Sequence, residues 1–213
     1  MSDLDFASLL CSRLCHDLVS PVGAINNGLE ILAEEKDPAM RDAVLDLIDK
    51  STRQTVNKLQ FFRLAFGAAG GFSAQLDMRE AEKATRALIS GSRIEMDWQV
   101  SVPSASKSVV KLLLNLCLVV SETLIRGGKI TVQLDEADEA INISVLASGA
   151  RIIFPENIRA TLTAGNAMDE LEPRTAPAHL ASLLVRELGG HLELDFTEGE
   201  QIAVHASLLK KAL

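Results

Sequence analysis

The sequence is poor in cysteine, in aromatic residues and in long apolar runs. Its 213 residues include three cysteines, one tryptophan and no tyrosine. So few cysteines exclude a disulfide scaffold, and without a recognisable signal peptide they indicate the reducing cytoplasm. The most apolar segment, Val109 to Ile125, carries Lys111 and Glu122. We therefore expect it to be a buried core helix and expect no membrane anchor.

Positive charge is also scarce. Lysine and arginine total 21 against 29 acidic residues, a net charge of −8. A nucleic-acid-binding surface needs a basic face, so we expect no nucleic-acid partner. The hydrophobic share of 47% is that of an ordinary globular protein, and the length fits one large or two small domains.

One amphipathic helical pattern near the N-terminus carries a histidine on its polar side. Its apolar residues recur every three or four positions and form one stripe: Leu10, Leu14, Leu18, Val22, Ile25, Leu29 and Leu32. At about 100° per residue, His16 falls on the opposite, outward face. The residues predicted to share that face are Ser12, Arg13, Ser20, Gly23 and Asn27.

His16 begins the sequence His16-Asp17-Leu18-Val19-Ser20-Pro21, which resembles the H-box of dimeric histidine kinases. A lone histidine is more often a core or idle surface residue, but this one faces outward and precedes an acid. Cys11 and Cys15, one turn apart, could be imagined as metal ligands beside His16. Zinc sites need three or four ligands, so we expect both to be small buried hydrophobes.

The first 68 residues are predicted to form a helical hairpin. The helices span about Asp3 to Glu35 and Ala39 to Phe66, joined at Lys36-Asp37-Pro38, with a kink at Pro21. Two such helices cannot bury both apolar stripes against each other. A second copy would complete a four-helix bundle, so a homodimer is expected.

A glycine-rich segment, residues 67–71, predicts a boundary between a hairpin domain (1–68) and a second domain (72–213). Helices are predicted at 77–90, 106–125, 155–162 and 177–188. Strands are predicted at 94–102, 130–134, 140–146, 191–196 and 201–207, with turns at Gly127-Gly128 and Gly189-Gly190. Helices on an antiparallel sheet indicate an α+β sandwich.

This order of elements resembles the ATP-binding domain of histidine kinases, the Bergerat-type α/β sandwich, but with its nucleotide motifs degenerate. Asn115-Leu116 matches the start of the asparagine box, whereas its second, magnesium-holding position is Val119. In the first glycine box, Ala147 replaces the adenine-binding Asp and Arg151 a glycine. Residues 174–180, in the place of the phosphate loop, contain no glycine. We therefore expect no ATP binding.

A phosphorylatable hairpin joined to a disabled kinase domain resembles the dimeric histidine phosphotransferases of the ChpT type. The resemblance implies a phosphorelay step in which His16 receives a phosphoryl group from one receiver-domain Asp and passes it to another. It implies a CckA-like hybrid-kinase receiver as donor and CtrA-like and CpdR-like response regulators as acceptors. The receivers would supply Mg²⁺, so no cofactor is expected here.

Within that resemblance, Asp17 would orient the His16 ring and Arg13 would neutralise phosphoryl charge. Ser20, Gly23 and Asn27 would form the partner face, Pro21 would be structural, and His179, His191 and His205 are expected to be structural too. Two alternatives stay open: an ATP-dependent histidine kinase with divergent boxes, and a non-catalytic adaptor that binds receivers.

Overall fold

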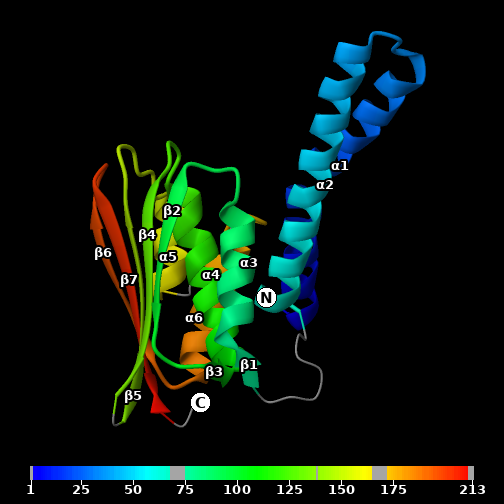
Figure 1. Ribbon diagram of the computed structural model, residues 1–213. Coiled ribbons are helices and arrows are strands. Elements are labelled where there is room, and N and C mark those ends of the chain that lie inside the picture. The colour runs from blue at the N-terminus through cyan, green and yellow to red at the C-terminus, as the bar shows by residue number, and fades with distance from the viewer. Residues whose placement is uncertain (1, 68–74, 138, 165–171, 211–213) are drawn as a thin grey trace.

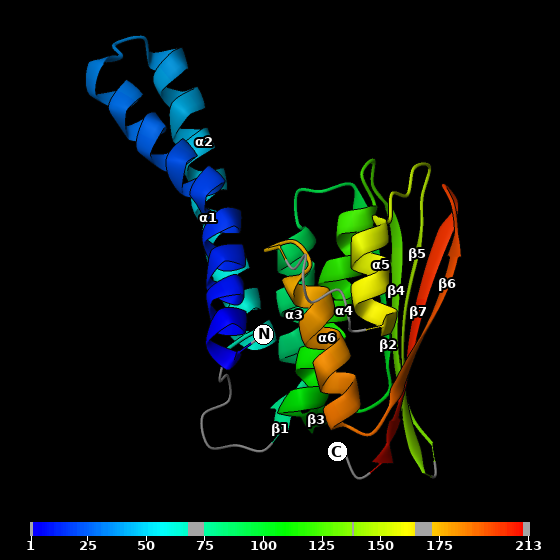
Figure 2. The ribbon, with the colours of Figure 1, turned by 180° about the vertical axis from the view of Figure 1, so that it is seen from behind.

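The computed structural model describes residues 2–67, 75–137, 139–164 and 172–210. A long helical hairpin lies beside an α/β sandwich, and the hairpin's tip extends well beyond the sandwich (Figures 1 and 2). Beyond Gly67, the predicted boundary segment lies outside the described residues.

The hairpin consists of α1 (Asp3–Glu34) and α2 (Pro38–Ala65). Ser2 and Asp5 form a capping box at the start of α1, and the Asp37 side chain accepts a hydrogen bond from the Ala39 N–H at the start of α2. The α-helix α1 continues through Pro21, and Figure 2 shows that the helix changes direction part-way along its length. The predicted helical hairpin is confirmed.

The sandwich contains a five-stranded sheet in the order β2-β4-β5-β7-β6. The strands are β2 (Ile94–Val100), β4 (Gly128–Glu136), β5 (Ala140–Ser148), β6 (His191–Thr197) and β7 (Gln201–Leu209). A separate antiparallel pair joins β1 (Gln75–Asp77) to β3 (Ser104–Ser106). Burial alternates along β5 and β7, because one sheet face is covered and the other is open.

Four helices cover one face of this sheet (Figure 1). They are α3 (Met78–Ile89), α4 (Lys107–Thr123), α5 (Glu156–Ala164) and α6 (Ala176–Glu187). The predicted core helix is confirmed, since most residues of α4 are buried. Its position between the sheet, α6 and α2 explains why its sequence is apolar on nearly all sides.

The expectation of a wholly antiparallel sheet is wrong. β2 pairs with β4 in parallel, with Trp98 opposite Val132. The chain passes through α4 between these two strands, and a helical crossover of this kind brings the second strand back in the same direction. The other pairs in the sheet are antiparallel.

The glycine turn before β4 is required sterically. Gly127 has φ +84°, and a Cβ there would lie 2.3 Å from the Arg93 carbonyl oxygen. Any side chain at position 127 would therefore clash with the main chain of Arg93 and disturb the start of the parallel β2–β4 pair.

In the part of the chain that the structure describes, no helix is both long and apolar enough to cross a membrane.

Candidate functional site

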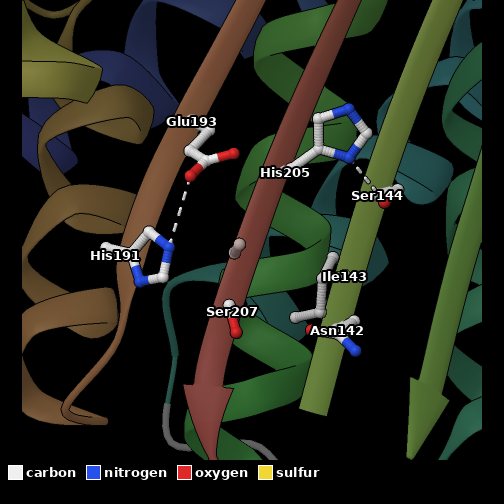
Figure 3. Close-up of a pocket in the computed structure, with 8 residues that line it drawn as sticks. Asn142, Ile143, Ser144, His191, Glu193, His205 and Ser207 are labelled. Atoms are coloured by element: carbon white, nitrogen blue, oxygen red, sulfur yellow. Dashed lines mark hydrogen bonds and ion pairs between the residues drawn. The ribbon is translucent and has the colours of Figure 1, made fainter. Parts of the chain in front are cut away.

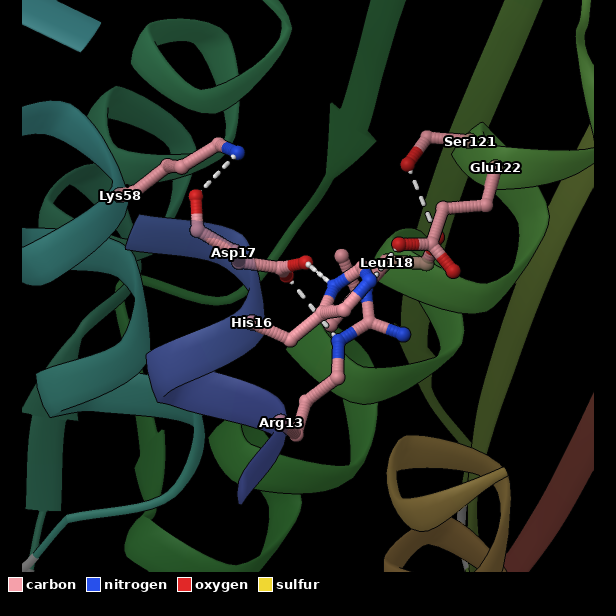
Figure 4. A network of polar contacts seen from close by, with 7 residues as sticks. All are labelled: Arg13, His16, Asp17, Lys58, Leu118, Ser121 and Glu122. Atoms are coloured by element: carbon pink, nitrogen blue, oxygen red, sulfur yellow. Dashed lines mark hydrogen bonds and ion pairs between the residues drawn. The ribbon is translucent and has the colours of Figure 1, made fainter. Parts of the chain in front are cut away.

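His16 lies on the outward side of α1 and forms a hydrogen bond with the acid that follows it. Its side chain is 69% exposed, and its Nδ1 lies 3.1 Å from Asp17 Oδ1 (Figure 4). An ionised carboxylate can only accept, so this contact requires a proton on Nδ1. The neutral ring then presents the lone pair of Nε2, which makes Nε2 the nucleophilic atom.

The Asp17 carboxylate also binds Arg13. Arg13 Nε donates to Asp17 Oδ2 at 3.0 Å, so the two carboxylate oxygens have different partners. The second partner of Arg13 is Glu122 in α4, which accepts from the guanidinium Nη2. Figure 4 shows these groups as one polar network that spans α1 and α4.

The expectation that Arg13 faces solvent is wrong, since its relative exposure is 2%. The helical pattern places Arg13 away from the apolar stripe, but its guanidinium reaches Glu122 at the C-terminal end of α4. Burial by itself would lower the pKa of Arg13, but the carboxylates of Glu122 and Asp17 outweigh it and raise that pKa. Arg13 is therefore a buried cation between two carboxylates and is not free to meet a phosphoryl group.

Pro21 affects the main chain at Asp17. A proline has no N–H, so Pro21 cannot donate the helical hydrogen bond to the carbonyl oxygen four residues earlier, which is that of Asp17. Lys58 in α2 supplies the missing donor: its Nζ lies 2.9 Å from the Asp17 carbonyl oxygen. Asp17 is thus bound through both its side chain and its main chain (Figure 4).

Three further residues of the predicted outward face, Ser20, Gly23 and Asn27, lie along α1 after His16. Ser20 and Asn27 are exposed, Gly23 is half-buried, and Pro21 is buried. A Cβ at Gly23 would meet no atom within 4 Å, so the space above it is open. Ser20, Gly23 and Asn27 can therefore be reached by a partner protein.

The residues at the kinase nucleotide positions do not fit ATP or its magnesium. Asn115 is fully buried, and its Nδ2 donates to the carbonyl oxygens of Ala65 at 3.1 Å and Lys111 at 2.8 Å. Val119 and Ala147 are also buried, and neither can coordinate a cation or bind an adenine amino group. The Asn115 side chain instead connects α4 to the end of α2.

The predicted phosphate-loop position is also filled by packing. Residues 176–180 are already the first turns of α6, and Ala176, Pro177 and Ala178 are buried. One turn on, the His179 ring contacts the Phe6 ring of α1 at 5.1 Å between centroids. The N-terminal part of α6 therefore packs against the hairpin.

The expectation that Cys11 and Cys15 are buried is wrong. Both are exposed on α1, whereas Cys117 is buried in α4. Cys11 lines the apolar groove between α1 and α2, which leaves its thiol open to solvent. Within the described residues, no group of three or more histidine, cysteine, aspartate or glutamate side chains could hold a metal ion.

A separate shallow hollow of about 270 Å³ lies on the sheet (Figure 3). The Ser144 hydroxyl and His205 Nδ1 are 2.8 Å apart, and His191 lies 3.5 Å from Glu193. The strands β5, β6 and β7 supply these residues, and the pairs join side chains of the sheet to one another. His205 and His191 thus lie in ordinary sheet contacts, away from α1.

Two residues of the His16 network, Glu122 and Lys58, were not anticipated in these roles. A signal for Glu122 was present, because it is the only carboxylate in the apolar segment from Val109 to Ile125. A signal for Lys58 was present as well, because a proline inside a helix leaves one carbonyl oxygen in need of a donor.

The sequence matches the family described as Histidine phosphotransferase C-terminal domain over residues 78–200. It is also 36% identical over 198 residues to the protein phosphotransferase ChpT of Brucella abortus (strain 2308), covering 92% of this chain and 93% of that protein. The chain belongs to the ChpT family of histidine phosphotransferases. The predicted family is therefore confirmed.

The structural comparison agrees with membership of the ChpT family. A solved bacterial phosphotransferase, determined at 1.7 Å, superimposes with a TM-score of 0.85 and 34% identity, covering 97% of each chain. A more distant match is the Acinetobacter baumannii histidine kinase AdeS, with a TM-score of 0.46, 9% identity, and coverage of 91% of this chain and 97% of that one.

Proposed function

We propose that His16 carries a phosphoryl group between aspartates of two receiver domains. The observation that carries the proposal is the exposed His16 ring, whose Nδ1 is hydrogen-bonded to Asp17 and whose Nε2 pairs with no carboxylate of the residues that the structure describes. The donor would be the receiver of a CckA-like hybrid kinase, and the acceptors CtrA-like and CpdR-like response regulators. These partners follow from the family resemblance.

In the forward step, the Nε2 lone pair forms a bond to phosphorus as the bond from phosphorus to the donor aspartate oxygen breaks. The bonding electron pair leaves with that oxygen and restores the donor carboxylate. The ring now carries the phosphoryl group on Nε2 and a proton on Nδ1, so it is cationic. Asp17 stabilises this charge through the Nδ1–H hydrogen bond. Transfer to the acceptor aspartate reverses these changes.

Nothing in this step requires ATP or a metal ion bound to this chain. The acidic pocket of each receiver would supply Mg²⁺ beside the phosphoryl group. The partner face would include Ser20, Gly23 and Asn27, and the sandwich domain would help to dock the receiver beside His16. Arg13 has no direct part, because it is buried.

The same proposal includes a homodimer. Apolar side chains remain exposed on both hairpin helices: Val22 and Leu29 on α1, and Leu45, Val56 and Leu59 on α2. An apolar groove between the helices, lined by Leu10, Leu14 and Phe62 among others, continues this surface. Pairing with a second hairpin as a four-helix bundle would bury these side chains.

The deciding experiment compares two labelled donors. Acid-labile label is measured after incubation with a radiolabelled phosphorylated receiver domain, or with radiolabelled Mg-ATP. We expect label from the receiver only, and none in His16→Ala. His191→Ala is the matched control, because its side chain is exposed to a similar degree, 66% against 69%.

Label from ATP alone would instead indicate a kinase, and no label from several receivers would indicate an adaptor. The melting temperature of His16→Ala should stay close to that of the wild type, since the ring is exposed. Sedimentation tests the dimer: Leu59→Asp should shift the protein to monomer, whereas Leu183→Asp, an exposed leucine of α6, should not.

A further inference from the structure

We infer that Glu122, in the sandwich, is a positioning residue for His16, acting through Arg13 and Asp17. This inference rests on the proposed function and extends it, because it assigns the degenerate kinase-like sandwich a part in the phosphotransfer site. Glu122 touches neither His16 nor, in the proposed step, the phosphoryl group.

The two oxygens of the Asp17 carboxylate have different partners. Oδ1 accepts from His16 Nδ1, and Oδ2 accepts from Arg13 Nε. With Oδ2 fixed by Arg13, the carboxylate plane is oriented so that Oδ1 faces the imidazole. The orientation of Arg13 therefore determines whether Asp17 can fix the His16 tautomer.

Arg13 is in turn oriented by two carboxylates. Its guanidinium is almost wholly buried, so its charge and donors need protein partners. Glu122 takes Nη2 while Asp17 takes Nε, which fixes the planar guanidinium from two sides. Without Glu122, the cation would be left with Asp17 as its single carboxylate. The guanidinium would then either bind both Asp17 oxygens or move away from Asp17. In either case Asp17 Oδ1 would no longer be held in position to accept a hydrogen bond from His16.

The main chain of Asp17 does not depend on Glu122. Lys58 binds the Asp17 carbonyl oxygen from α2, within the hairpin. Loss of Glu122 should therefore change the side-chain arrangement and leave α1 in place. Such a loss lowers the rate of phosphoryl transfer without unfolding the hairpin.

The test measures phosphoryl acceptance from a labelled phosphorylated receiver domain in the full chain. Glu122→Ala should lower the rate at saturating donor about 10- to 100-fold, as expected for misplacement of a reacting group. Glu122→Asp, which keeps the charge, should recover part of the rate. Glu80→Ala is the matched control: Glu80 in α3 pairs with Arg63 in α2 at 3.0 Å, another pair between sandwich and hairpin, but it is not part of the His16 network.

A mutant cycle separates positioning from direct contact with the receiver. If Glu122 acts through Arg13, Glu122→Ala should cause no further loss of rate in an Arg13→Ala background. If the two losses multiply instead, Glu122 contacts the receiver independently and the inference is wrong.

The ring itself gives a readout that needs no phosphoryl donor. In protein labelled with ¹⁵N-histidine, with His16 assigned by its absence in His16→Gln, we expect the Nδ1–H tautomer in wild type and Glu80→Ala. Glu122→Ala should shift His16 toward the Nε2–H tautomer that solvated imidazole prefers. An unchanged tautomer would overturn the inference. A wild type that takes no phosphoryl group would refute the proposed function, yet this measurement would still decide the role of Glu122.

Discussion

Lys58 Nζ donates a hydrogen bond to the Asp17 carbonyl oxygen, which Pro21, four residues later and without an N–H, leaves without its helical donor. The proline of the H-box and a lysine of the second helix are therefore complementary. The main chain next to His16 is joined to α2, although helical geometry alone would leave it unpaired.

This relationship predicts a strong coupling between Lys58 and Pro21. Lys58→Met should lower the free energy of unfolding by about 1–2 kcal/mol, because it leaves the Asp17 carbonyl without a donor. In a Pro21→Ala background, the N–H of residue 21 can donate to the Asp17 carbonyl oxygen. Lys58→Met should then lower the free energy of unfolding by less than about 0.5 kcal/mol. Urea unfolding at one protomer concentration provides all four values. If Lys58→Met lowers the free energy of unfolding equally in both backgrounds, the contact between Lys58 and the Asp17 carbonyl oxygen contributes nothing to stability.

Asn115 should behave as a structural residue. Its buried amide donates to Ala65 and Lys111, so Asn115→Ala should lower the free energy of unfolding by about 2 kcal/mol. The control is Asn26→Ala. The Asn26 amide donates to Glu30 on the exposed side of α1, so its loss should lower the free energy of unfolding by no more than about 0.5 kcal/mol. Similar losses in the two variants, measured by urea unfolding, would contradict this role.

Stability should fall as the pH drops below the ordinary pKa of histidine. Burial, followed by the nearby charge of Arg186, lowers the pKa of His179 from 6.5 in the folded protein. Below pH 6.5 the unfolded chain therefore binds a proton that the folded chain does not, and stability falls by less than about 1.4 kcal/mol per pH unit. In His179→Gln this dependence should weaken, whereas exposed His191→Gln should keep it. Unfolding at pH 5, 6 and 7 compares the three slopes, and parallel slopes for all of them would rule His179 out.

Two glycines of α1 should respond oppositely to alanine. Gly23→Ala adds a methyl group to open space and should stabilise the helix by about 0.5–1 kcal/mol. At Gly28 the new Cβ would lie 2.7 Å from Ile48 Cγ1, so Gly28→Ala should be less stable than Gly23→Ala by about 1 kcal/mol or more. Thermal melts rank the pair. If Gly23 lies under a docked receiver, Gly23→Ala should also slow phosphotransfer despite its greater stability.

The regular elements could be predicted from local patterns. Apolar residues every three or four positions predicted both hairpin helices, and the glycine pair at 127–128 marked the turn before β4. The three-residue strands β1 and β3 are too short to show an alternating pattern and were missed. The parallel β2–β4 pair was missed because pairing direction depends on how the chain crosses the sheet.

In the candidate site, too, contacts between neighbouring residues could be predicted from the sequence, whereas contacts between distant segments could not. The hydrogen bond between His16 and Asp17 could be predicted, because the two residues are adjacent in the sequence. The burial of Arg13 could not, because its partner Glu122 lies 109 positions away and helical periodicity describes only one helix. Val22 and Leu29 were expected to be buried but are exposed, because the surface proposed to cover them would come from a second copy.

The ion pair between Arg13 and Glu122 also limits how such proteins can be recombined. A hairpin grafted onto the sandwich of a relative would bring its buried arginine to a foreign helix, and only a carboxylate at the position of Glu122 would receive it. The hairpin and the sandwich of such phosphotransferases could then be exchanged between relatives only where the arginine and the carboxylate are both present. Exchange of the receiver-facing surface alone, which leaves Arg13 and Glu122 untouched, would be the safer route to altered signalling specificity.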